Sequence, residues 1–110
     1  MLRFTGLLKL DKRNRVLIDG TVIKRSDLRY TPAGMPVLEL VITHLSEQIE
    51  AGRHRKVECE VAMMALGDIA AKLDPVQIGQ RLASKGFIAA KSNRYRNELV
   101  LHLEEFELLN

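Results

Sequence analysis

Apolar and polar residues alternate with a period of two along most of this chain, which predicts extended strands. The alternation is clearest from residue 57 to 63, where every second residue is apolar and the residues between them are mostly charged. This pattern places Cys59 on the apolar face and predicts that it is a small core residue and no reactive thiol. Similar runs predict four more strands, over residues 15–23, 37–44, 80–91 and 99–108.

A helical period occurs in one place. Residues 65–73 carry apolar side chains at helical spacing, and Asp74-Pro75 ends the segment. Glycines at positions 20 and 86 predict bends, and a change of phase near residues 104–105 predicts a bulge in the last strand. The element order predicts an all-β fold, a five-stranded OB-fold barrel with one short helix between strands three and four.

The second predicted strand is apolar on both faces. One face must cover the core, so the sequence predicts that the other meets a second subunit and that the protein is a homodimer. Residues 45–52 lack an apolar period and are predicted to form an acidic connection ending in glycine. A basic cluster follows directly, consisting of Arg53, His54, Arg55 and Lys56.

Two predicted loops combine cations with a tyrosine. Arg29 and Tyr30 precede the turn residues Pro32-Ala33-Gly34. Residues 91–97 contain three cations and no acid, namely Lys91, Arg94 and Arg96 around Tyr95. Single-stranded nucleic acid is bound by cations that hold phosphates and by flat rings on which bases stack. The sequence therefore predicts a single-stranded nucleic-acid binder that uses these two loops and the basic cluster.

Other classes of function have less support in the sequence. The three histidines are widely separated, and no metal-ligand spacing, phosphate loop or nucleophile motif occurs, so neither an enzyme nor a bound cofactor is expected. A protein-interaction module with weak or no nucleic-acid binding stays open as the alternative. It is favoured by Glu58, Glu60 and the last thirteen residues, which carry four acids and no cation.

The chain divides into a leader of residues 1–13, without a clear period, and one domain over residues 14–110. With a single cysteine and no internal disulfide, the expected compartment is the cytoplasm. No apolar run approaches the roughly 20 residues that span a bilayer, and no secretory signal is recognised at the N-terminus.

The residues also resemble a known family. Asn14-Arg15-Val16-Leu17, the segment 31–36, Glu50-Ala51-Gly52 before His54-Arg55, Gly86-Phe87-Ile88 and Val100-Leu101-His102 are similar to primosomal replication protein N, often called PriB. The resemblance covers about residues 14–108. It implies a homodimeric OB fold that binds single-stranded DNA and assists a helicase in restarting stalled replication.

The resemblance also implies roles for particular residues. The family's DNA-contacting basic residues fall on Arg29 in the first loop and on Lys91, Arg94 and Arg96 in the last loop. Two positions depart from the family pattern: Glu58 replaces an aromatic residue that stacks on DNA, and Leu45 replaces an arginine. Both changes remove attraction for DNA, so either the affinity for DNA is lower here or Tyr30 and Tyr95 contribute more to binding.

Overall fold

The computed structural model describes residues 13–109, so all of the predicted leader except Arg13 lies outside the described residues. The elements follow one another in this order: β1 (Val16–Arg25), β2 (Arg29–Tyr30), β3 (Pro36–Glu50), β4 (Arg53–Leu66), α1 (Asp68–Leu73), β5 (Arg81–Ala90) and β6 (Leu99–Leu108). Within the described part, no helix is long and apolar enough to cross a membrane.

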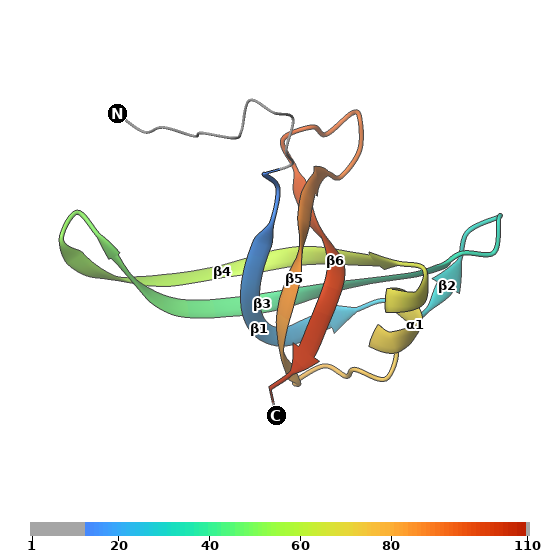
Figure 1. Ribbon diagram of the computed structural model, residues 1–110, viewed down its shortest axis with the longest axis horizontal. Coiled ribbons are helices and arrows are strands. Elements are labelled where there is room, and N and C mark those ends of the chain that lie inside the picture. Colours follow the sequence, from blue (N-terminus) through green and yellow to red (C-terminus); the bar gives the residue numbers. More distant parts are fainter. Residues whose placement is uncertain (1–12, 110) are drawn as a thin grey trace.

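The five long strands close into a barrel, which confirms the predicted OB fold. The strand order is β1-β5-β6-β4-β3-β2, and an additional pairing of β1 with β3 completes the circle. Figure 1 shows β1, β5 and β6 standing across the long β3–β4 pair. The helix α1 follows β4, which is the third long strand because β2 has only two residues.

The barrel interior is filled by the predicted alternating residues. Leu38, Leu40 and Ile42 of β3 are buried, as are Leu82 of β5 and Leu101 of β6. The helix α1 and the segment after it cover one end of the barrel with the buried side chains of Ala70, Leu73 and Val76. The core is therefore built from every second residue of the strands, as expected for a sheet with one face inward.

Two glycines permit close contact between strands. A Cβ atom at Gly86 would lie 1.9 Å from the carbonyl oxygen of His102, and one at Gly20 would lie 2.5 Å from that of Thr43. The expected bulge in β6 is present, because Lys85 pairs with Glu105 and Gly86 pairs with Leu103, which leaves Glu104 unopposed. These irregularities let the strands curve around a small core.

The helix begins later than predicted. Gly67 adopts a left-handed conformation with φ of 81° between β4 and α1. Leu66 consequently ends β4 as an exposed residue and does not form the first turn of the helix. The predicted helix over residues 65–73 is shortened at its N-terminal end, because β4 continues to pair with β3 as far as Leu66.

The largest difference from the predictions is the length of β3 and β4. They pair from Val37 with Leu66 to Glu50 with Arg53, so the predicted connection over residues 45–52 is strand except for the turn at Ala51-Gly52. Residues 44–60 extend beyond the barrel as a two-stranded ribbon, called here the arm, visible on the left of Figure 1. Cys59 lies in the arm and is exposed, so its predicted place in the core is wrong.

Candidate nucleic-acid interface

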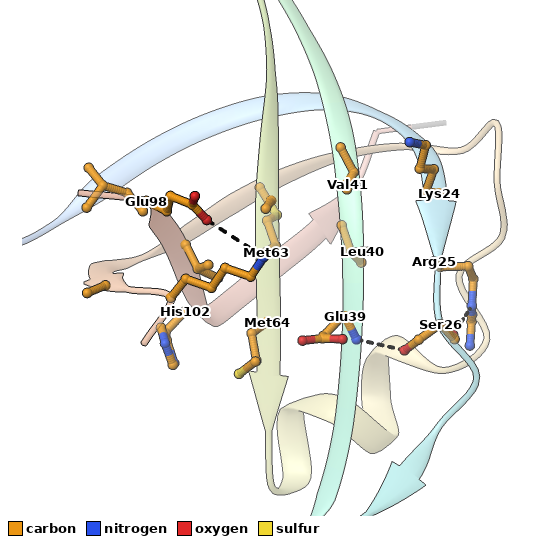
Figure 2. A pocket seen from close by; sticks show the side chains of 15 residues that line it. Lys24, Arg25, Ser26, Glu39, Leu40, Val41, Met63, Met64, Glu98 and His102 are labelled. Atoms are coloured by element: carbon orange, nitrogen blue, oxygen red, sulfur yellow. Dashed lines mark hydrogen bonds and ion pairs between the residues drawn. The ribbon is translucent and has the colours of Figure 1, made fainter. Parts of the chain in front are cut away.

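A groove of about 840 Å³ crosses the outer surface of the barrel. Its floor contains Val41 of β3 and Met64 of β4, whose side chains point away from the barrel core. Figure 2 shows these two strands running between Lys24, Arg25 and Ser26 on one side and Glu98 and His102 on the other. The groove is therefore an open channel with a mainly apolar floor and charged groups at both edges.

The β5–β6 loop (residues 91–98) forms one edge of the groove. It is tied at its base by a hydrogen bond of 2.7 Å from the Lys91 amide to the Glu98 carbonyl, and their side chains form an ion pair at 3.7 Å. At its tip, the amide of Tyr95 donates to the carbonyl of Ser92 at 3.1 Å. The loop is thus held in a defined shape by its own backbone.

The tip of this loop presents an aromatic ring and two arginines. Tyr95 is 45% exposed, and the guanidinium carbon of Arg94 lies 5.7 Å from the centre of its ring. Arg94 and Arg96 form no ion pair with any residue from 13 to 109. Their charges are not balanced by an acid, so they can pair with phosphate groups without first breaking an ion pair.

Arg29 lies near the opposite edge of the groove, and Tyr30 follows it in the same strand with its side chain on the other face of the sheet. They form β2, which pairs with β3 through Arg29 opposite Val37 and Tyr30 opposite Pro36. The side chain of Arg29 contacts that of Glu39, a groove residue, at 3.2 Å. Tyr30 is 63% exposed just before the predicted turn, where the amide of Gly34 donates to the carbonyl of Thr31 at 2.8 Å.

The basic cluster Arg53–Lys56 does not line this groove. It belongs to β4 at the tip of the arm, whereas Arg29 pairs at the opposite end of β3. At about 3.3 Å per residue, the two positions are separated by roughly 40 Å along that strand. The groove is thus lined by the base of one tyrosine loop, through Lys91 and Glu98, and it adjoins the other loop through the contact of Glu39 with Arg29. Neither Tyr30 nor Tyr95 is among the lining residues, and the basic cluster lies apart from the groove.

The strand geometry also divides the basic cluster between two faces. Successive side chains of a strand point in opposite directions, so Arg53 and Arg55 share one face while His54 and Lys56 share the other. Arg55 pairs with Glu50, and His54 lies 2.7 Å from Glu47. Two of the four cationic positions are thus already matched by acids within the arm.

Lys24 is a groove residue that the alternation pattern does not reveal. Counted from the buried Val22, its position should face the core, but the β1–β3 pairing shifts between Val22 and Lys24. Ile23 is the extra residue of this bulge, which turns Lys24 to the outer face opposite Val41. The sequence did contain a signal of this bulge, because the alternation assigns the charged Lys24 to a core position.

His102 also lines the groove and was not predicted as a site residue. Its ring stacks on that of Phe87, with ring centres 5.0 Å apart and planes inclined by 9°. Phe87 is 36% exposed on the outer face. The stacked rings extend the apolar surface from the groove onto β5.

Comparison with known proteins defines the class of this fold and groove. Residues 14–105 match the family model described as another single-strand binding protein family, so the chain belongs to a family of single-strand binding proteins. A relative from Nitrosomonas europaea called replication restart protein PriB is 39% identical over 97 residues, which cover 88% of this chain and 89% of the relative. Another from Escherichia coli O1:K1 is 32% identical, covering 88% and 95% of the two chains. The chain belongs to the PriB family of replication restart proteins.

Solved structures give the same assignment. PriB from Ralstonia solanacearum superposes with a TM-score of 0.80 at 30% sequence identity, covering 90% of this chain and 100% of that chain. The single-stranded DNA-binding protein from Thermus aquaticus superposes with a TM-score of 0.71 at 26% identity. This chain is covered over 88% of its length and spans half of the Thermus aquaticus chain. The predicted family resemblance is confirmed.

Proposed function

We propose that this protein binds single-stranded DNA along the groove and acts, without catalysis, in the restart of replication. The observation that carries the proposal is an open groove on the outer face of the barrel, with Lys91 at the base of the β5–β6 loop at one edge and Lys24 at the other. In OB folds the outer face and the corresponding loops bind oligonucleotides. The names of the relatives, a single-stranded DNA-binding protein and a replication restart protein, support the same role.

In this proposal the charged edges hold phosphates and the rings stack on bases. Arg29 and Lys24 supply cations on one edge, and Arg94 and Arg96 supply them on the other. The exposed ring of Tyr95 provides a stacking face at the tip of the β5–β6 loop, and Tyr30 provides one for a strand that passes around the edge of β2, each worth roughly 1–3 kcal/mol per base. Neither loop contributes a base-reading pattern, so binding is expected to depend little on sequence.

The basic cluster has a secondary role in this proposal. A strand longer than the groove must pass around the edge of the arm to reach Arg53 and Arg55, because the arm face that continues from Val41 carries His54 and Lys56. Arg53 forms no ion pair with the described residues, so its charge is available to phosphate. Substitution of Arg53 is expected to weaken binding of long oligonucleotides and to leave short ones unaffected.

The binding test uses a fluorescein-labelled oligo-dT and the matching duplex at two salt concentrations. Single-strand binding that becomes weaker with salt is expected, because each cation that contacts a phosphate displaces a condensed counterion. Equal affinity for the duplex would contradict the assigned ligand. Absence of binding to either nucleic acid would favour the protein-interaction module, which the acids of β4 and β6 also support.

We further propose that the protein is a cytoplasmic homodimer that assists a replication-restart helicase. The outer face of β3, predicted as the subunit contact, is partly occupied within the chain itself, because Val37 is buried and Val41 lines the groove. A more suitable surface lies on β1, where Leu17 is 76% exposed and residues 16–20 pair only with β5. Sedimentation that shows a monomer at tens of micromolar would contradict the dimer.

A further inference from the structure

One face of the arm continues from the groove floor and lies beyond the residues that line the groove. Residues opposite each other in the pairing of β3 and β4 share a face, so the side that continues from Val41 can be followed to the tip. This outer arm face consists of Leu45, Glu47, Ile49, His54, Lys56, Glu58 and Glu60. No third strand pairs with residues 44–60 among the described residues, so the face is open on both sides.

Two large apolar side chains stand on this face without cover. Leu45 is 61% exposed and Ile49 is 64% exposed. A ribbon of two strands is only marginally stable in water and is normally stabilised by packing against another element. Polar residues at these positions would keep the arm soluble, so a leucine and an isoleucine on the same side indicate a surface that is covered in an assembly.

Carboxylates surround Leu45. Glu58 is directly opposite in the pairing, Glu60 is two residues further along β4, and Glu47 is two residues further along β3 on the same face. Glu58 and Glu60 form no ion pair with residues 13–109. The same face also carries Lys56 and His54, and His54 contacts Glu47. The three carboxylates outnumber these two residues, so the face has an acidic balance, which repels DNA phosphates and attracts a cationic ligand.

We propose that the outer arm face binds a basic, partly apolar segment of a partner protein. Lysine and arginine side chains combine an aliphatic stem with a charged end. Their stems would pack on Leu45 and Ile49, and their charged ends would lie among Glu47, Glu58 and Glu60. The groove stays free when the arm is occupied, so DNA and this partner can bind the protein at the same time.

The test uses a labelled twelve-residue peptide of alternating lysine and leucine as the partner probe, with fluorescence anisotropy as the readout. A lysine–serine peptide and a glutamate–leucine peptide of equal length serve as probe controls. The lysine–leucine peptide is expected to bind most tightly. Leu45→Ser, and separately the double variant Glu58→Gln with Glu60→Gln, are each expected to weaken its binding at least tenfold.

Matched protein controls lie outside the arm. Ile78→Ser removes a comparably exposed apolar side chain, 61% exposed in the segment after α1, and Glu104→Gln removes an exposed acid from β6, so neither should change peptide binding. Equal binding of the two lysine peptides, unchanged affinity in the arm variants, or no binding of the lysine–leucine peptide would overturn the proposal. A dimer that dissociates on Leu45→Ser would also overturn it, because the occupant would then be a second copy.

The DNA experiment keeps this inference separate from the proposed function. Oligo-dT affinity of the arm variants is expected to equal or exceed that of the unchanged protein, since removal of Glu58 and Glu60 lowers the repulsion of phosphates. If the unchanged protein binds the peptide and not oligo-dT, the groove assignment fails and the arm assignment stands. If the unchanged protein binds oligo-dT and not the peptide, only the arm assignment is excluded.

Discussion

The sharpest prediction concerns the two uncompensated arginines at the tip of the β5–β6 loop. The perturbation is the double substitution Arg94→Gln with Arg96→Gln. On a single strand, each phosphate contact releases about 0.7 of a counterion, so two lost contacts reduce the slope of log K against log salt by about 1.4. Between 50 and 200 mM salt, this difference changes the relative affinity of the two proteins by about sevenfold.

The structure predicts a smaller effect for Lys91 than for either arginine. Lys91 is already paired with Glu98 at 3.7 Å, so DNA must compete with that carboxylate for its charge. Adding Lys91→Gln to the double variant should therefore change the slope by less than the 0.7 expected for a free cation on a single strand. If Lys91, Arg94 and Arg96 contributed equally, the triple variant would reduce the salt slope by about 2.1.

The assay is titration of labelled oligo-dT at four or more salt concentrations, with circular dichroism to verify the fold of each variant. Lys72→Gln is the matched charge control, since Lys72 is exposed in α1 away from the groove and should leave the slope unchanged. If the folded double variant has the slope of the unchanged protein, the loop makes no phosphate contact and the reasoning about the groove is refuted.

The remaining predictions concern stacking and stability. Tyr95→Ala should weaken oligo-dT binding by roughly 1–3 kcal/mol without changing the salt slope, because stacking moves no counterions; a changed slope would contradict this. Gly86→Ala should lower the free energy of unfolding by about 3 kcal/mol in urea titration, because the new Cβ forces β5 away from the His102 carbonyl. Leu38→Ala should cost about 2–5 kcal/mol in the same assay through the cavity it leaves, whereas Ile78→Ala, at an exposed position, should cost little. Thermal unfolding should be insensitive to a chelator, and a lowered midpoint would reveal an overlooked metal.

The sequence predicted the barrel well because its strands have one buried face. Leu38, Leu40 and Ile42 repeat with a period of two, and the break in that period located the bulge at Glu104. The alternation reports which face a residue occupies but not how far the barrel extends over it. Cys59 therefore has the phase of a core residue and still lies exposed in the arm.

The candidate site was less predictable for related reasons. The arm buries little, so residues 45–50 have no apolar period that would mark them as strand, and the basic cluster next to them was assigned to a loop. The bulge at Ile23 places Lys24 on the outer face of the barrel, whereas the alternation assigns it to the core face. His102 lines the groove because β6 pairs with β4, which places His102 opposite Met64. The local sequence pattern does not show this pairing, since the two residues are far apart in the sequence.

Strand β1 pairs partly with β3 and partly with β5, which affects how the protein folds during synthesis. Its second half pairs with β3, beginning with Thr21 opposite Thr43, but its first half pairs with β5, where Val16 is opposite Gly86. During synthesis β1, β3 and β4 can form an open sheet while the partner of Val16 is still missing. Their apolar inner face then stays uncovered until β5 and β6 emerge, and such exposed intermediates are prone to aggregate. Slow translation between residues 66 and 81 would lengthen that interval.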